Sequence, residues 1–139
     1  MSVIVRDNGF GADDWTGTFT GPDGLAANSV ARGLDLPSDT QPATLAGKLD
    51  GIDLIRIDFP TFADGRGFTI ARQLRLMGYG RRLRARGHVI ADQYAMARRA
   101  GFDEVEISGD LATRQTEDQW LYRANWQAHD YQSRLRRAL

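Results

Sequence analysis

The sequence predicts an α/β fold in which about four mainly parallel strands alternate with helices in an open-faced or half-barrel-like layer, followed by a long C-terminal helix. Two observations support this. Beyond residue 30, apolar stretches of strand type alternate with stretches of helical period, which is typical of a parallel sheet with crossover helices. The length of 139 residues suits one domain. We therefore expect a single domain over 1–139, with an irregular N-terminal segment at 1–30, βα units at 31–110 and the helix at 114–139.

The elements follow in order. The first 30 residues are dense in glycine, aspartate and threonine, so they predict turns with at most two short strands, at 3–5 and near 15–19. Hydrophobic periodicity then predicts the central elements. These are a strand at 31–36, a short helix at 42–49, a strong strand at 52–59, a helix at 67–77, a strand at 81–86, a helix at 89–100 and a strand around Val105 and Ile107.

The last predicted element is a long amphipathic helix that is capped near Thr116. Its apolar stripe consists of Leu121, Ala124, Ala128, Tyr131, Leu135 and Ala138. If its own sheet does not cover this stripe completely, the stripe would form a homodimer surface.

Charged residues recur at every second position of the predicted strands. Strands that helices cover on both faces are usually apolar throughout. We therefore expect one charged sheet face that is lined by cross-strand ion pairs, exposed to a ligand, or covered by the N-terminal segment or a second subunit. The residues concerned are Arg56, Asp58, Arg82, Arg84, Arg86, Glu104 and Glu106.

Composition narrows the class of protein. The 18 lysines and arginines balance 18 acidic residues, so the chain lacks the basic field that attracts nucleic acid or an anionic membrane. No apolar run reaches the roughly 20 residues that cross a bilayer, and the first residues do not resemble a signal peptide. We expect a cytoplasmic protein. The absence of cysteine excludes disulfides, thiolate nucleophiles and iron–sulfur or zinc sites built on thiolates.

The segment at 58–69 is the strongest candidate for a functional site. It joins the C-terminal end of the best strand to the next helix, and ligands of α/β sheets bind at that edge. Gly65 and Gly67 permit close approach of the backbone. The free amides of a helix N-terminus together with Arg66 suit a small oxyanion such as phosphate, sulfate, sulfite or a carboxylate.

Other interpretations of this segment stay open. Asp58 and Asp64 could hold a hard cation, or one of them could act as a general base. The segment could also be purely structural, with Asp64 and Gly65 forming a turn and Arg66 pairing with a neighbouring aspartate. It contains neither the dinucleotide fingerprint nor the lysine-containing phosphate loop, so the cofactor is unknown and no metal site is predicted.

The strings DFPTFADGRGFTIARQLR, LRARGHVIADQ and GFDEVEI resemble an uncharacterised bacterial family whose members often carry the name probable oxidoreductase. Genes of that family commonly lie beside genes for assimilatory sulfite or nitrite reduction. The resemblance covers residues 34–107, and it implies an accessory role in sulfur assimilation. Carried over position by position, the family pattern falls on Asp58, Phe59, Pro60, Phe62, Asp64, Gly65, Arg66, Gly67, Arg72, Leu83, Arg84, Gly87, Asp92 and Gln93.

The resemblance adds Arg72 and Arg84 to the candidate anion-binding residues, and Asp92 and Gln93 as residues that support the site. His88 stands where an acidic residue is expected, which argues against a catalytic role for that position. His129 is expected to be a surface residue.

Two functions are consistent with these observations. The first is a non-catalytic accessory protein of sulfite reduction that binds the sulfite reductase or a small anion. Sulfite reduction itself needs siroheme and an iron–sulfur cluster that thiolates normally hold, and this chain has no thiolate. The alternative is a small enzyme in which Asp58 or Asp64 acts as base or metal ligand, beside Arg66 and Arg84, on an anionic or phosphorylated substrate.

Overall fold

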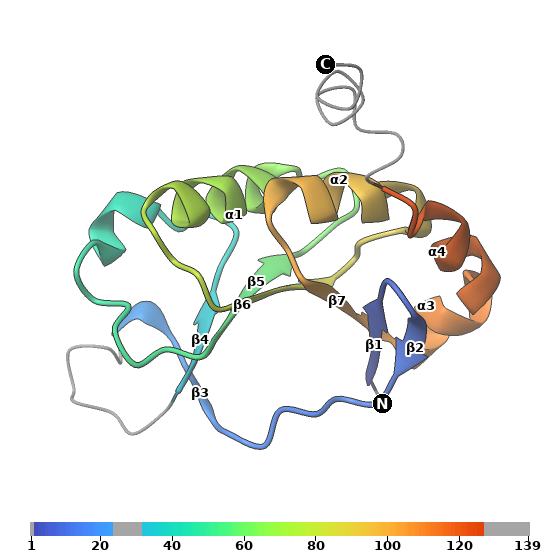
Figure 1. Cartoon of the computed structure of the whole chain (residues 1–139), viewed down its shortest axis with the longest axis horizontal. Helices are drawn as coiled ribbons and strands as arrows, with labels where there is room; N and C mark the ends of the chain where they lie inside the picture. The colour runs from blue at the N-terminus through green and yellow to red at the C-terminus, as the bar shows by residue number, and fades with distance from the viewer. Residues whose placement is uncertain (1, 24–31, 127–139) are drawn as a thin grey trace, which may run out of the picture.

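The computed structural model describes residues 2–23 and 32–126 of the chain. Within these residues the strands form one seven-stranded sheet in the order β2-β1-β7-β6-β5-β4-β3 (Figure 1). The strands are β1 (Ser2–Arg6), β2 (Gly9–Gly11), β3 (Phe19–Thr20), β4 (Gly33–Leu36), β5 (Leu54–Phe59), β6 (Arg82–Gly87) and β7 (Glu104–Ser108).

The sheet is mostly parallel. Strands β3 to β7 run parallel to one another, and β1 pairs antiparallel with both β7 and β2. The predicted α/β class with a mainly parallel sheet is therefore confirmed, but the expected number of about four strands is wrong. The additional strands lie in the segment that was expected to be irregular. β1 overlaps the short strand that was expected at 3–5, whereas β2 and β3 are too short to show alternation. β1 pairs with β7, β2 pairs with β1, and β3 pairs with β4.

The helices alternate with the later strands. They are the short 3₁₀ segments η2 (Pro42–Leu45) and η3 (Ala91–Gln93), and the α-helices α1 (Arg66–Leu76), α2 (Tyr94–Ala100), α3 (Gly109–Arg114) and α4 (Glu117–Arg123). Helices α1 and α2 lie side by side on one face of the sheet (Figure 1). None of the helices in 2–23 and 32–126 is both long and apolar enough to span a membrane.

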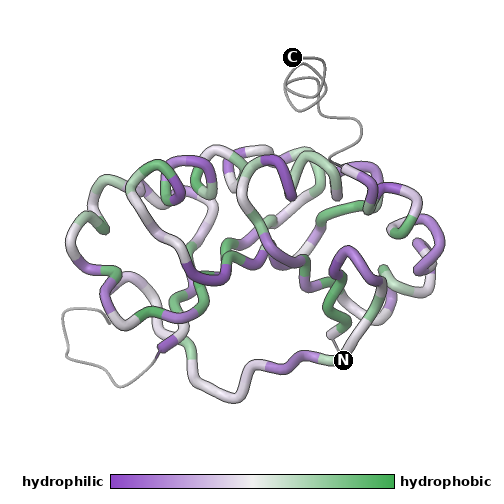
Figure 2. The backbone as a smooth tube through the Cα atoms, viewed as in Figure 1, coloured by the Kyte–Doolittle hydropathy of each residue, from purple (hydrophilic) through white to green (hydrophobic). Residues whose placement is uncertain are grey.

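The hydrophobic core lies between this helical layer and the sheet. Ile55, Ile57 and Phe59 of β5 alternate with charged residues, and they pack against Ile70 and Leu74 of α1. Hydrophobic and hydrophilic residues accordingly alternate along the central strands (Figure 2). Because side chains of a strand point to opposite faces in turn, the charged set gathers on the face away from α1 and α2.

The predicted long C-terminal helix is not evident. Helix α3 ends at Arg114, Thr116 is the N-cap of α4, and α4 runs for seven residues from Glu117 to Arg123. The indole of Trp126 then lies under the Arg98 guanidinium, 4.9 Å from its ring centre, and donates a hydrogen bond to Asp7 at 3.4 Å. These tertiary contacts hold the chain after α4 against another part of the molecule. The stripe residues from Ala128 onward lie outside the described residues.

Candidate functional site

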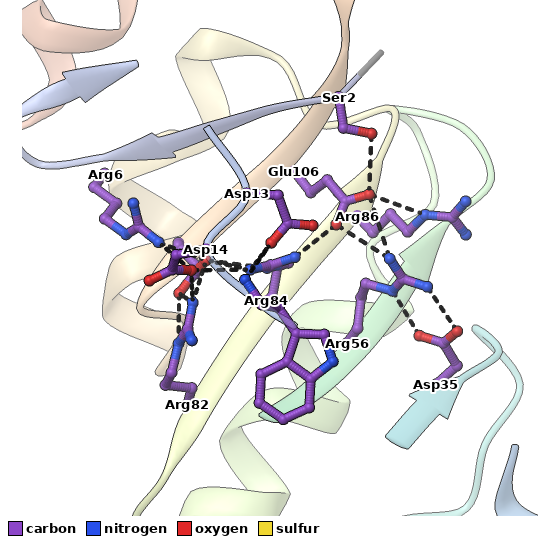
Figure 3. A network of polar contacts seen from close by, with 12 residues as sticks. Ser2, Arg6, Asp13, Asp14, Asp35, Arg56, Arg82, Arg84, Arg86 and Glu106 are labelled. Atoms are coloured by element: carbon purple, nitrogen blue, oxygen red, sulfur yellow. Dashed lines mark hydrogen bonds and ion pairs between the residues drawn. The ribbon is translucent and has the colours of Figure 1, made fainter. Parts of the chain in front are cut away.

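A network of ion pairs occupies the centre of the charged sheet face (Figure 3). Arg84 of β6 is fully buried, and its guanidinium contacts Glu104 at 2.9 Å, Glu106 at 2.8 Å and Asp13 at 3.1 Å. A buried charge is tolerated only where partners replace its hydration. The donors of Arg84 are therefore committed to carboxylates of the protein itself.

Residues 12–18, which we call the strap, cross the charged face between β2 and β3 (Figure 1). Asp13 of the strap contacts Arg84, and Asp14 contacts Arg82 at 2.8 Å and Arg6 at 3.0 Å. Burial opposes ionisation of Asp13, yet hydrogen bonds from Arg84 and from the strap's own backbone hold its pKa below the ordinary value. The pKa of Asp14 is lowered in the same way, against burial, by the hydrogen bond from Arg82.

Arg56 of β5 is held almost as completely. Its guanidinium forms a two-point contact with Asp35 at 2.6 and 2.8 Å, approaches Glu106 at 3.2 Å, and lies 3.8 Å from the ring centre of Phe19. The expectation of a face lined by cross-strand ion pairs and covered in part by the N-terminal segment describes this region. An external anion would have to displace one of these carboxylates to reach Arg56 or Arg84.

A cleft of about 420 Å³ opens next to this network, at the carboxyl ends of β5, β6 and β7. Ligands of α/β proteins bind at this edge of parallel sheets. Its polar lining residues are Ser2, Asp58, Arg86, His88, Glu106 and Ser108. A second cleft of about 240 Å³ adjoins it, and both are lined by Asp58 and Arg86.

Arg86 is the cation that this cleft presents to a ligand. About half of its side chain is exposed, and its one ion pair in the described part of the chain is a long contact of 3.5 Å from Nε to Glu106. No hydrogen bond of its two terminal nitrogens is found within 2–23 and 32–126. The terminal nitrogens of Arg86 can therefore donate to an anion without breaking a close ion pair.

Asp58 faces Arg86 across the β5–β6 ladder. The two residues are partners in the register of the parallel pair, so their side chains project from the same face. Neither an ion pair nor a side-chain hydrogen bond involves Asp58 in the region that the structure describes. A carboxylate with spare acceptors thus lies in the same cleft as a guanidinium with spare donors.

Gly87 brings His88 to this edge. Its φ of 117° is in the left-handed region, and a Cβ there would lie 2.6 Å from the carbonyl oxygen of Phe59. This close approach lets the amide of His88 donate to the same oxygen at 2.9 Å. The side chain of His88 is exposed and lines the cleft.

The predicted loop has a different arrangement. The guanidinium of Arg66 forms a two-point contact with Asp64, at 2.7 and 3.0 Å, and also donates to Ser38 at 2.9 Å. Hydrogen bonds from the Arg66 side chain and amide lower the pKa of Asp64 to about 2. Asp64 and Arg66 therefore satisfy one another instead of facing the cleft that contains Asp58.

The other predicted anion-binding residues are not brought together. Arg72 is exposed on α1, whereas Arg84 is buried on the opposite face of the sheet. A Cβ at Gly67 would collide with the ring of Phe59, while a Cβ at Gly65 would meet nothing closer than Phe68 at 3.9 Å. The close packing of α1 against β5 therefore explains why residue 67 is a glycine.

Gln93 does support the predicted loop. Its side-chain amide donates to the carbonyl oxygen of Phe62 at 2.7 Å, and its side-chain oxygen accepts from the amide of Ile90 at 3.1 Å. This residue links the loop after β5 to the loop after β6. Asp92 is exposed and pairs with Arg123 at 3.1 Å.

The residues that sequence reasoning missed are Arg86, Ser2 and Ser108, and His88 was considered but set aside. The alternation of charge in β6 already placed Arg86 on the charged face. The sequence did not show the register of β5 and β6, which places Arg86 opposite Asp58. Among the described residues, no group of three or more histidine and acidic side chains is arranged to hold a metal ion.

Residues 33–138 match the model of a family described as bacterial protein of unknown function (DUF934). The chain belongs to this family. The match includes β4 to β7 and the residues Asp58, Arg86 and His88, while β1 and the strap lie outside it. No curated protein and no solved structure matches the chain.

Proposed function

We propose that this chain is an accessory protein of assimilatory sulfite reduction, and that it binds a small oxyanion in the cleft at the carboxyl edge of β5, β6 and β7. One observation carries the proposal. Arg86 presents a half-exposed side chain with unengaged terminal nitrogens to a cleft that also contains the hydroxyl of Ser108 and the imidazole of His88. Guanidinium and hydroxyl donors are suited to oxyanions.

The neighbouring arginines support this choice by contrast. Arg84 and Arg56 are enclosed by carboxylates at 2.6–3.2 Å, and Arg66 is held by Asp64. An anion at any of these positions would compete with a close ion pair. At Arg86, an anion would compete only with the long contact of 3.5 Å to Glu106.

The link to sulfite reduction rests on the resemblance of the central segments to a family encoded beside the reductase genes. An accessory role is preferred to the reduction itself because the chain contains no cysteine to hold an iron–sulfur cluster. Sulfite is a small oxyanion, so the chemistry of the cleft and the resemblance are consistent with one another.

Anion binding is tested by titrating the purified protein with sulfite and with phosphate while following its amide resonances. We expect the largest shifts at residues 86–88 and 106–108, and we expect Arg86→Gln to abolish saturable binding. Arg72→Gln is the matched control, because it removes an exposed arginine from α1. Arg66→Gln tests the loop that the sequence favoured: loss of binding in this variant, with normal binding in Arg86→Gln, would move the site to Asp64 and Arg66.

The accessory role is tested in cells. A deletion strain should fail to grow on sulfate or sulfite as sole sulfur source and should grow on sulfide or cysteine. The wild-type gene should restore growth, and the Arg86→Gln gene should not. Normal growth of the deletion strain on sulfite would remove the link to sulfite reduction. Co-purification of the reductase with the tagged protein would add a direct partner.

A second candidate is a small enzyme, and one observation favours it. Asp58 lines both clefts with no described partner, so it is placed to accept a proton from water or from a substrate bound to Arg86. This candidate predicts hydrolysis of nitrophenyl phosphate or nitrophenyl sulfate by the wild type and by Asp92→Asn, but not by Asp58→Asn. Absence of turnover by the wild type on both esters removes it.

A further inference from the structure

The proposed anion cleft contains a carboxylate in addition to its cation. Asp58 and Arg86 occupy matched positions of β5 and β6 and line the same two clefts. A ligand that bridges to the guanidinium of Arg86 therefore comes close to the carboxylate of Asp58. This is an unusual neighbour for an anion, because two negative charges repel.

The other charged groups at this edge do not neutralise Asp58. On β7, Glu106 contacts Arg84 and Arg56 closely, makes the long contact with Arg86 at 3.5 Å, and accepts a hydrogen bond from Ser2 of β1. In the adjoining cleft, the Asp35 carboxylate is held by Arg56. Glu106 and Asp35 therefore already have arginine partners within the protein.

The remaining charged or titratable groups facing the site are Arg86 and His88. Asp58 is therefore the acceptor with free capacity in the part of the cleft that the structure describes.

An ionised carboxylate only accepts hydrogen bonds. It repels an oxyanion that has lost all its protons, and it accepts a hydrogen bond from an oxyanion that has kept one. Hydrogen bonds to charged groups contribute enough to change an affinity by about tenfold or more. The same carboxylate thus weakens the binding of fully ionised oxyanions and strengthens the binding of oxyanions that carry a proton.

We infer that the cleft selects small oxyanions that carry a proton, such as hydrogen phosphate or hydrogen sulfite, over fully ionised ones such as sulfate, and that Asp58 makes the selection. Arg86 supplies the charge attraction that all oxyanions share. Asp58 accepts a hydrogen bond from the oxygen that carries the proton. This inference rests on the proposed function, since it assigns the ligand class of the same cleft.

The test compares inorganic phosphate with sulfate by calorimetric titration at neutral pH and low ionic strength. Phosphate keeps at least one proton there, and sulfate keeps none. We expect phosphate to bind the wild type about tenfold more tightly or better. In Asp58→Asn the side-chain amide can donate to sulfate and no longer repels it, so the ratio of affinities should fall to one or invert. Asp92→Asn removes an exposed carboxylate elsewhere and should keep the wild-type ratio.

A measurement on the wild-type protein makes the inference independent of the variant's folding. Hydrogen sulfite loses its proton near neutral pH, so sulfite affinity should fall from about pH 6 to about pH 8. Sulfate does not change its protonation state in this range, so the sulfate series reports the pH dependence of binding that all anions share. The fall for sulfite should exceed the fall for sulfate.

Each outcome distinguishes the two claims. If neither phosphate, sulfite nor sulfate binds, the proposed anion site fails. If sulfate binds the wild type as tightly as phosphate, the anion site stands and the selection by Asp58 is overturned. Equal pH dependence of sulfite and sulfate, or an unchanged affinity ratio in a folded Asp58→Asn protein, overturns it as well.

Discussion

The guanidinium of Arg84 donates to the carboxylate of Asp13 across 3.1 Å, and so joins the centre of the sheet to the strap. The two residues are 71 positions apart in the chain. Arg84 is completely buried, and Asp13 is one of four carboxylates within 3.9 Å of its guanidinium. The network fixes the charged face of the sheet and leaves the cleft at its edge open.

Arg84→Met should destabilise the protein by about 3–5 kcal/mol, because it leaves Glu104 and Glu106 buried with less compensation. Chemical denaturation measures the free energy of unfolding. Arg81→Met is the matched control, since Arg81 is largely exposed and pairs with Asp53 at the surface; it should cost at most about 1 kcal/mol. Equal losses in the two variants would mean that the buried network does not contribute as described.

Asp13→Asn should loosen the strap without unfolding the sheet. It removes a charged acceptor from Arg84, whose close contacts with Glu104 and Glu106 remain, and because Asp13 is partly exposed the cost should be about 1 kcal/mol. Amide hydrogen exchange should accelerate in the strap and stay unchanged in β5. Asp50→Asn, at an exposed position away from the strap, should change neither. Faster exchange throughout the sheet would contradict a local role.

Acid should release the strap. The pKa values of Asp13 and Asp14 are lowered in the folded protein from the ordinary value of 3.8, chiefly by Arg84 and Arg82 acting against burial. A lowered folded pKa contributes stability that is fully present above the unfolded pKa and is lost as pH falls through the folded pKa. The difference in unfolding free energy between the wild type and the Asp13→Asn, Asp14→Asn double variant should therefore be constant above about pH 5 and shrink below about pH 4. A constant difference down to the lowest pH measured would argue against these ion pairs.

Gly67→Ala should destabilise the protein by about 1–3 kcal/mol, because the added Cβ collides with the ring of Phe59. Alanine favours a helix interior over glycine by about 1 kcal/mol, so the collision has to outweigh this gain. Gly65→Ala should change stability by less than about 1 kcal/mol, since its Cβ meets only Phe68 at van der Waals distance. Thermal unfolding of both variants checks the contrast. Stabilisation by Gly67→Ala would show that α1 can shift away from β5.

Gln93→Ala should free the loop after β5. The variant loses the hydrogen bonds to the carbonyl of Phe62 and the amide of Ile90, which we expect to cost about 1 kcal/mol. Amide hydrogen exchange should increase at residues 61–65. Asp92→Ala, which removes an exposed ion pair with Arg123, should leave that loop unchanged. Similar exchange rates in both variants would contradict the role of Gln93 in linking the two loops.

The sequence predicted the βα units well because their signals are local. Alternation in β5 and β6 and the helical period of α1 depend on residues that are neighbours in the chain, so the core and the charged face followed from them. The prediction of a long C-terminal helix was wrong. Its apolar stripe gave no sign of the break at Gln115 and Thr116 or of the contact between Trp126 and Arg98. Strands β2 and β3 are three and two residues long, so they show no hydrophobic alternation from which they could be predicted.

For the candidate site, the chain alone determined which residues carry charge and which edge of the sheet a ligand would approach. It predicted Asp58 as a site residue, and Asp58 lines the cleft at that edge. Tertiary structure decided which cations are free. Arg84 became a buried structural ion because the strap and β7 surround it, Arg66 turned to Asp64, and Arg86 alone in the described β6 kept its terminal donors unengaged. Strand register and the path of the strap set these distances. Both depend on contacts between residues far apart in the chain, which no local pattern encodes.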